Sequence, residues 1–236
     1  MDASSIPHHV PGDLKSPSRK PETLLIGIGC FVGALALAIT AAWPNVDVEL
    51  ARAAMIPADS AMRSLLLPLR EACRITPYLL FCGVAIVLTV RASRARARAS
   101  AAWRKLIFVS LTLALGPGLA VNAGLKSYSH RPRPAQTIEV GGGDMPFRPF
   151  FRFDGACSSN CSFSSGEATS AFWTSAPALL APPAYRAAAT AVALGFGAIV
   201  SAQRMALGAH FLSDVAFSAL VVLMLTLIAR RVIFKT

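Results

Sequence analysis

The sequence predicts an all-α membrane protein, a bundle of six transmembrane helices with both termini in the cytoplasm. Two observations support this prediction. Of 236 residues, 54% are hydrophobic and only 15% are charged, whereas about 25% of the residues of an ordinary soluble domain are charged. The apolar residues also gather into runs that approach the roughly 20 residues a helix needs to cross a bilayer.

The chain is predicted to form one domain behind a short tail. Residues 1–23 are polar and rich in proline, with no apolar core of a signal peptide, so we expect a disordered cytoplasmic tail there. Residues 24–236 are expected to form the six-span domain. The predicted spans are 24–43, 78–90 (extending as far as 96), 106–125, 168–181, 187–203 and 215–229. Pro57 and Pro68 break the segment 44–75, which predicts a loop with one or two interfacial helices.

The positive charge is placed as in a membrane protein rather than in a nucleic-acid-binding protein. The formal net charge is +11. Lysine and arginine residues precede the first span, separate the second from the third, and follow the last, as cytoplasmic flanks do under the positive-inside rule. We therefore expect membrane lipids and no nucleic acid as partners. With six spans, the loops 44–77, 126–167 and 204–214 share the opposite face.

Two cysteines lie in the largest hydrophilic loop, 126–167. Cys157 and Cys161 are four residues apart, and this loop supplies too few ligands for a zinc site. Two interpretations stay open. The pair forms a disulfide if the loop faces an oxidising compartment, or the two side chains are free thiols.

Three cations lie near the ends of predicted spans on that opposite face. Lys126 and Arg133 follow the third span, and alone they fit interfacial cations that snorkel to the headgroups. Arg204 follows the fifth span on the side that positive charge usually avoids. A charge in such a place is usually paired or functional.

A histidine and a carboxylate are spaced to face one another. His210 and Asp214 lie on one face if the turn between them is helical. An Asp bonded to one imidazole nitrogen fixes the tautomer and leaves the lone pair of the other nitrogen free. The alternative is a helix cap formed by Ser213 or Asp214, with His210 incidental.

A serine and a glycine precede the fourth predicted span. Gly166 permits close approach of the backbone to a ligand, and N–H groups at a helix N-terminus bind anions. Ser164 or Ser165 also fits an ordinary N-cap, with Glu167 in the first turn. The two interpretations are compatible.

Taken together, these residues resemble the motifs of the type 2 phosphatidic acid phosphatases, a superfamily shared with vanadium haloperoxidases. Its first motif is Lys, six residues, Arg-Pro, and its third is Arg, five residues, His, three residues, Asp. Both are matched in full, by Lys126, Arg133 and Pro134 and by Arg204, His210 and Asp214. The resemblance covers roughly residues 24–230.

The chain departs from the family pattern at the second motif, which is Pro-Ser-Gly-His. Ser165 and Gly166 match, whereas Ser164 and Glu167 replace the proline and the histidine. Gln203 also stands where a serine usually precedes the arginine of the third motif.

The resemblance implies a phosphatase that needs no metal ion and no cofactor. The residues that would bind the phosphate are Lys126, Arg133, Ser165, Gly166 and Arg204. His210 would attack the phosphorus and form a phosphohistidine that water hydrolyses, and Asp214 would orient it. The fixed cations would stabilise the charge of the transferring phosphoryl group.

Glu167 occupies the position of the family histidine that protonates the leaving oxygen. We place Glu167 among the catalytic residues, and three roles stay open for it. It is the acid, a partner for Lys126 or Arg204, or the mark of a substrate with a better leaving group.

The expected function is therefore a lipid phosphatase of a bacterial inner membrane, with its active site facing the periplasm. The size and layout are similar to those of lipid A phosphatases, which favours a lipopolysaccharide lipid as substrate. Undecaprenyl diphosphate and phosphatidylglycerol phosphate are alternative substrates. A lipid phosphotransferase and a non-catalytic lipid-phosphate-binding protein are alternative functions. The sequence does not predict an oligomeric state.

Overall fold

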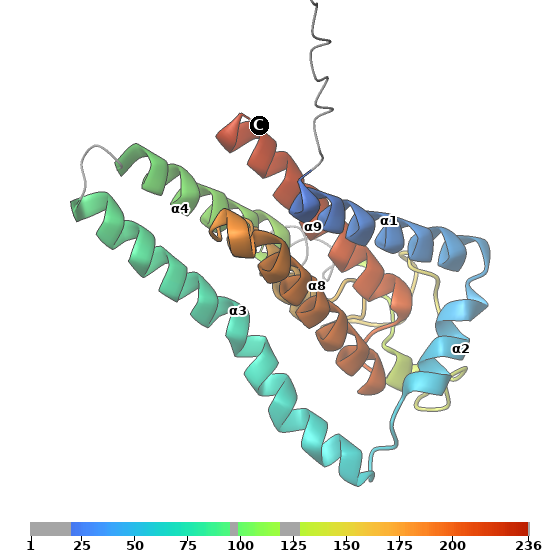
Figure 1. The fold of residues 1–236 in the computed structure, drawn as a ribbon. Helices are drawn as coiled ribbons and strands as arrows, with labels where there is room; N and C mark the ends of the chain where they lie inside the picture. Colours follow the sequence, from blue (N-terminus) through green and yellow to red (C-terminus); the bar gives the residue numbers. More distant parts are fainter. Residues whose placement is uncertain (1–19, 95–98, 119–127, 236) are drawn as a thin grey trace, which may run out of the picture.

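The computed structural model describes residues 20–94, 99–118 and 128–235, and its regular elements are helices (Figure 1). They are α1 (Pro21–Ala42), α2 (Asn45–Ala54), α3 (Ala61–Arg94), α4 (Ala99–Leu113), α6 (Gly166–Trp173), α7 (Ser175–Ala178), α8 (Pro183–Ala206), α9 (Leu212–Phe234) and the 3-10 helix η3 (Pro134–Gln136). No β-sheet forms within these ranges; Thr137 and Met145 make one isolated bridge. The all-α class is confirmed. Most of the predicted tail, 1–23, lies outside the described residues.

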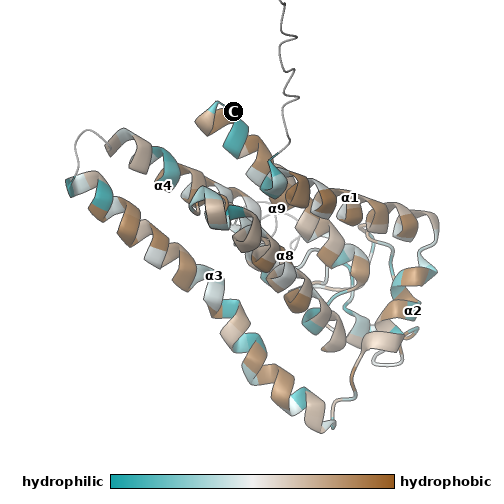
Figure 2. Ribbon diagram, in the orientation of Figure 1, coloured by the Kyte–Doolittle hydropathy of each residue, from teal (hydrophilic) through white to brown (hydrophobic). Residues whose placement is uncertain are grey.

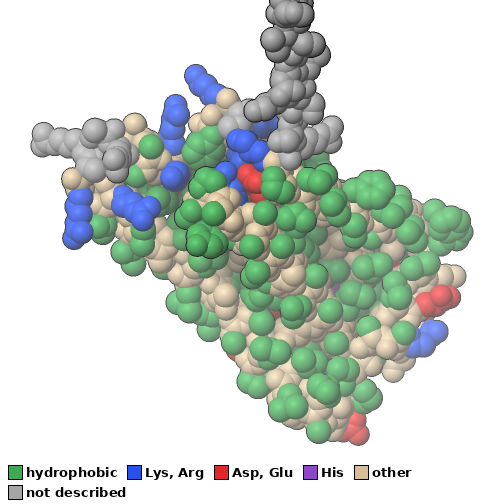
Figure 3. Space-filling view, in the orientation of Figure 1, with side chains coloured by type: hydrophobic (Ala, Val, Ile, Leu, Met, Phe, Trp, Pro, Cys, Tyr) green, Lys and Arg blue, Asp and Glu red, His purple; other side chains and the backbone are tan. Residues whose placement is uncertain are grey.

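Five helices of the described part are long and apolar enough to cross a membrane. They are α1, α3, α8, α9, and α4 with its continuation to Gly118. Their outer faces are apolar, as at Phe31, Leu79 and Val192, whose side chains are 67%, 66% and 72% exposed. Figures 2 and 3 show hydrophobic residues along the outside of the bundle. A bilayer covers such faces, so the protein is a multi-pass membrane protein.

The segment predicted as the fourth span differs from the prediction. Residues 168–181 form two short helices, α6 and α7, which meet at Thr174 instead of forming one continuous helix. Pro177 explains the break, because it has no N–H to bond the carbonyl of Trp173 and its ring crowds that carbonyl. The side chains of Trp173 and Ala176 are fully buried. The segment therefore runs through the interior of the bundle.

The loop predicted over 44–75 is also more helical than expected. Its first part contains the helix α2, in the segment where the sequence predicts an interfacial helix. The expected break at Pro68 is wrong, because α3 runs for 34 residues through Pro68 and Pro77. Each proline removes one backbone hydrogen bond, which a membrane helix tolerates as a bend.

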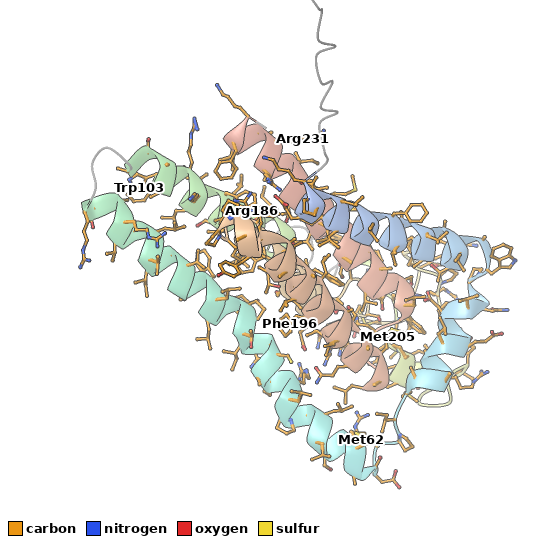
Figure 4. All side chains as sticks on the ribbon, in the orientation of Figure 1. Met62, Trp103, Arg186, Phe196, Met205 and Arg231 are labelled. Carbon is orange, nitrogen blue, oxygen red and sulfur yellow. A yellow bond between two sulfur atoms is a disulfide. The ribbon has the colours of Figure 1, made fainter. Side chains whose placement is uncertain are left out.

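Basic residues mark one end of the bundle (Figure 3). One pocket is lined by Leu179 and by basic residues from the residue before α1, from α4, and from the start of α8 and the end of α9, namely Lys20, Lys105, Arg186 and Arg230. Arg91 and Arg94, at the end of α3, line a neighbouring pocket with Lys105. Figure 4 labels Arg186 and Arg231 toward this end and Met62 and Met205 toward the other.

The apolar core lies between the two ends. Its fully buried members include Ile26, Phe108, Trp173 and Val222, which come from α1, α4, α6 and α9. The indole N–H of Trp173 donates to the hydroxyl of Thr112, 3.0 Å away, so no polar atom of the ring is left unbonded there. This core fixes α6 and α9 side by side, with their N-termini at the end opposite the basic residues.

Candidate active site

His210 lies in the turn between α8 and α9, and its side chain faces Asp214 of the first turn of α9. The imidazole Nδ1 is 3.6 Å from Asp214 Oδ2, and both side chains are buried. Gly208 makes this turn possible, because its φ is +67° and a Cβ there would lie 2.7 Å from Met55 Sδ. The structure thus brings together the two residues that the spacing predicted to face one another.

Asp214 is held in place by several donors. Its Oδ2 accepts from the backbone N–H of Phe211 at 2.8 Å and from the hydroxyl of Ser162. Its Oδ1 accepts from the guanidinium of Arg131. The N-cap residue of α9 is Phe211, not Ser213 or Asp214 as the alternative interpretation expected. Asp214 accepts from the Phe211 N–H and also faces His210, so His210 is not incidental to this helix start.

Arg131 is the central residue of a buried network that the sequence did not reveal. Its side chain is fully buried and also bonds Asp47 of α2 and Ser213, each at 2.8 Å. The guanidinium lies 4.4 Å from the ring centroid of Phe211. Asp47 in turn accepts from the backbone N–H of Ser213 at 2.9 Å. Buried charges of this kind persist only when they are paired, so α2 and α9 are connected through Arg131.

The sequence offers one weak signal for this network, because Arg131 lies inside the first motif, two residues before Arg133. Asp47 carried no signal, because an acidic residue on an interfacial helix ordinarily faces water.

Burial lowers the pKa of His210, and the positive charges of Arg204 and Arg133 lower it further, while Asp214 acts in the opposite direction. The imidazole is therefore neutral at neutral pH. A neutral imidazole with Nδ1 toward a carboxylate keeps the lone pair on Nε2, which is the form that attacks an electrophile or takes a proton.

The cations predicted to bind phosphate differ in their surroundings. Arg204, in the last turn of α8, is buried, and its Nε is 3.5 Å from Glu167 Oε2; no hydrogen bond to this Nε is found within the described residues. The Arg133 guanidinium donates to the carbonyl and the side-chain oxygen of Asn160, at 3.0 and 2.8 Å. Burial lowers the pKa of Arg133. Lys126 lies outside the described residues.

Asn160 belongs to a short loop closed by a disulfide. Cys157 and Cys161 are bonded, which decides between the two interpretations of the sequence. The loop pairs with the first motif, because the Cys157 N–H donates to the His130 carbonyl at 3.1 Å. Nδ1 of His130 is also 3.0 Å from the Cys157 carbonyl.

Ser165 and Gly166 begin α6 beside α9. Ser165 is the N-cap, and its hydroxyl accepts from the N–H of Ala168 at 3.3 Å. Its own N–H donates to the hydroxyl of Ser218 at 3.0 Å, and that hydroxyl is 2.8 Å from the carbonyl of Asp214. The N-terminus of α6, where anions are favoured, is therefore fixed one turn from the Asp214 side chain.

Glu167 makes its closest contact with a residue that the sequence reasoning missed. Its carboxylate accepts from Nη2 of Arg70, on α3, at 2.6 Å and from Nε at 3.1 and 3.2 Å. Arg204, which was among the predicted partners, is farther away at 3.5 Å. Arg70 carried no signal because it lies in a stretch that was expected to be an interfacial loop.

Metal-ligand side chains do not gather at this site. Within the ranges that the structure describes, no three His, Cys, Asp or Glu side chains are placed to hold an ion together. The arrangement instead combines a neutral histidine with fixed cations and a helix N-terminus, which suits an anionic substrate.

Comparisons with known proteins identify relatives. The family model described as "PAP2 superfamily" matches residues 105–236. The chain is 44% identical over 104 residues to a lipid A 4′-phosphatase of Rhizobium leguminosarum, covering 44% of each chain. It is 36% identical over 135 residues to the lipid A 4′-phosphatase of Francisella tularensis subsp. novicida, covering 56% of this chain and 60% of the relative.

A third relative also matches this chain, whereas the solved structures give no match. The chain is 42% identical over 112 residues to the lipid A 4′-phosphatase of Rhizobium etli, covering 48% of this chain and 43% of the relative. The matches thus span about half the length of these curated relatives. No solved structure matches.

Proposed function

The chain belongs to the PAP2 superfamily, the family of type 2 phosphatidic acid phosphatases, and from this premise we propose that it is a membrane lipid phosphatase acting on lipid A. The observation that carries the proposal is the buried His210–Asp214 pair beside Arg133 and Arg204. The relatives matched are named lipid A 4′-phosphatases, which supports lipid A as the substrate and the 4′-phosphate as the group removed.

The reaction we propose has two steps. Nε2 of His210 attacks the phosphorus, a P–N bond forms, and the P–O bond to the lipid breaks. The leaving oxygen takes a proton from a water molecule and departs as the lipid hydroxyl. Water then attacks the phosphohistidine, the P–N bond breaks, and inorganic phosphate leaves with His210 restored. Asp214 holds the proton on Nδ1 and offsets the positive charge that His210 gains.

The phosphate oxygens need positive charge around them in both steps. Arg133 and Arg204, whose charges act on His210, supply it, and the N–H groups at Gly166 supply backbone donors beside the Ser165 cap. We assign Lys126 to the same set because it completes the first motif. Such preorganised charge is commonly the largest contribution to phosphoryl transfer.

We also propose six crossings of the membrane with both termini in the cytoplasm. The α6–α7 segment begins at the candidate active site and ends at Leu179 in the basic pocket, so it traverses the bundle as the other five helices do. The positive-inside rule assigns the basic end to the cytoplasm. The active site then faces the periplasm of a bacterial inner membrane.

Phosphate release by the purified full-length protein tests the proposal. The substrates are lipid A, undecaprenyl diphosphate and phosphatidylglycerol phosphate in detergent, and mass spectrometry identifies which lipid A phosphate is lost. We expect release from lipid A by the wild type and none by His210→Ala, which should elute and unfold like the wild type. Lack of release from every lipid phosphate would contradict the proposal. Near-normal phosphate release by His210→Ala would contradict the assignment of His210 as the nucleophile.

A further inference from the structure

Two departures from the family motifs contact the same segment of α3. Glu167, which replaces the histidine of the second motif, accepts hydrogen bonds from Arg70. Gln203, which replaces the serine before Arg204, donates from Nε2 to the carbonyl of Leu66 at 3.3 Å. Leu66 lies one helical turn before Arg70. These two unusual residues, from α6 and α8, therefore fix one turn of α3 against the candidate active site.

The fixed turn presents a guanidinium group at the site. Arg70 uses Nε and Nη2 on Glu167 and Nη1 on Glu71, the last at 2.9 Å. A guanidinium carries five N–H groups, and these contacts account for one on each nitrogen. Arg70 is partly buried, with 28% of its side chain exposed. One N–H of each terminal nitrogen is left for a ligand among the contacts of the described residues.

The position of Arg70 along α3 matches the depth of lipid phosphates. Arg94, at the basic end of α3, is 24 residues farther along the chain, or about 36 Å at 1.5 Å per residue. The hydrocarbon core of a bilayer is roughly 30 Å thick. Arg70 therefore lies at the level of the headgroups on the face that carries His210.

The charges around Glu167 are unbalanced in favour of an anion. Three guanidinium groups, those of Arg70, Arg133 and Arg204, act electrostatically on one another there. The carboxylates that face them are Glu167 and the more exposed Glu71. Asp214 also acts on Arg133, but it is already paired with the buried Arg131. A phosphate among these guanidinium groups would relieve their mutual repulsion.

We propose that Arg70 is a further substrate-binding residue, which donates to the phosphate of the lipid and which Glu167 and Gln203 hold in position. This inference rests on the proposed function. Glu167 acts as an acceptor in the pair, which is the role of a carboxylate that orients a cation rather than of an acid that gives up a proton. The pair thus replaces the family histidine with a cation delivered from α3.

The main test compares Arg70→Ala with Arg74→Ala. Arg74 lies one turn farther along α3, is about half exposed, and pairs only with Glu71 among the ion pairs of the described residues. We expect Arg70→Ala to lower kcat/KM about 10- to 100-fold, the effect of one hydrogen bond to a charged group. The Ki of inorganic phosphate should rise by a similar factor. Arg74→Ala should change neither by more than about twofold.

Glu167→Gln tests the positioning role. If Glu167 orients Arg70, then Glu167→Gln should raise KM alike for a diphosphate and a monoester lipid, and combining it with Arg70→Ala should add little. If Glu167 is instead a general acid, the two substrates should respond differently to its substitution. Glu167→Gln would then slow the monoester by about 10²–10⁴-fold and the diphosphate much less, because a departing phosphate is already a stable anion. That second pattern, with additive effects of the two substitutions, would overturn the positioning role.

Direct binding separates this inference from the proposed function. Calorimetric titration of inorganic phosphate into wild type, Arg70→Ala and Arg74→Ala needs no turnover. If the wild type releases no lipid phosphate but Arg70→Ala alone binds phosphate more weakly, the proposed function fails and Arg70 remains an anion-binding residue. If Arg70→Ala and the wild type bind phosphate equally, the inference is overturned. Arg70→Lys, which keeps the charge, covers the case in which Arg70→Ala does not fold.

Discussion

At the scale of single residues, the candidate site depends on which groups are charged. His210 is buried and neutral, while Asp214 beside it accepts from Arg131, Ser162 and the Phe211 N–H. A neutral nucleophile and an ionised neighbour suit the proposed first step, because the carboxylate gains interaction energy as His210 becomes positive. The long 3.6 Å separation of His210 and Asp214 fits a contact that tightens when substrate binds.

The pH dependence of the rate should reflect the lowered pKa of His210. Burial favours the neutral imidazole, so the reactive form persists as the pH falls to about 6.5, the ordinary value for histidine. The rate should decline only at lower pH. Since Asp214 raises this pKa, Asp214→Asn should move the acidic limb of kcat/KM to still lower pH while lowering the plateau.

Profiles of kcat/KM against pH, measured for the wild type and Asp214→Asn on one lipid substrate, check this prediction. The titration of the substrate itself is then the same for both proteins. An acidic limb that stays in place or moves to higher pH in Asp214→Asn would contradict the prediction.

The lowered pKa of His210 also makes the stability of the fold fall at acidic pH. The contribution of neutral His210 to folding is present above about pH 6.5 and is lost as the pH falls through the lower pKa of the folded protein.

Arg131→Met should lower the stability of the protein more than the substitution of an exposed arginine does. Without the guanidinium, Asp47 and Asp214 are buried without a cation, which costs about 3–5 kcal/mol. Thermal unfolding in detergent measures the loss, with the exposed Arg152→Met as control. Adding Asp47→Asn should recover part of the lost stability, because one of the two uncompensated charges is then removed. Strictly additive effects of the two substitutions would argue against the network.

At the scale of elements, the loop 157–161 acts as a support for the first motif. The disulfide closes five residues, and Asn160 between its cysteines binds the Arg133 guanidinium by two hydrogen bonds. A second connection joins the His130 carbonyl to the Cys157 N–H. Arg133, which we propose to bind phosphate, is thus held by a segment nearly 30 residues away in the chain.

Loosening this loop should weaken substrate binding more than it slows catalysis. Reduction of the disulfide, or Asn160→Ala, should raise KM about 3- to 10-fold, because Arg133 loses part of its orientation. The exposed neighbour Ser158→Ala is the matched control. Steady-state kinetics with and without reductant measures the effect. Equal KM values for wild type, reduced protein and Asn160→Ala would show that the loop does not support Arg133.

At the scale of the whole molecule, charge and chemistry lie at opposite ends. The basic pocket gathers Lys20, Lys105, Arg186 and Arg230, while His210 and Glu167 lie where α8 ends and α6 begins. An apolar surface separates the two ends (Figure 3). In the orientation we propose, the basic end meets the cytoplasm and its anionic lipids, and the other end meets the substrate headgroup.

Reporter fusions should confirm this orientation. Alkaline phosphatase, which is active only after export, should be active when fused after Val140 and inactive when fused after Lys235. A fluorescent protein that matures only in the cytoplasm should give the reverse result. Both measurements belong in intact bacterial cells, with protein levels compared by immunoblot. Activity of the exported reporter after Lys235 would place the C-terminus outside and contradict six crossings.

The sequence by itself determined the helical class, a span within each of the five long apolar helices of the described part, and the pairing of His210 with Asp214. These follow from local patterns, namely apolar runs of bilayer length and a separation of four residues on one helical face. The sequence also indicated the N-cap at Ser165. Each of these features depends on residues that are neighbours in the chain, so composition and spacing sufficed.

The tertiary structure alone decided the rest. Arg131 meets Asp47 across 84 positions and Arg70 meets Glu167 across 97, separations that no periodicity reports. The continuity of α3 through Pro68 and the division of 168–181 into α6 and α7 likewise depend on packing, because proline costs one hydrogen bond that the surroundings either tolerate or do not. The partners of buried charges are chosen by the fold, since desolvation makes an unpaired charge there too costly.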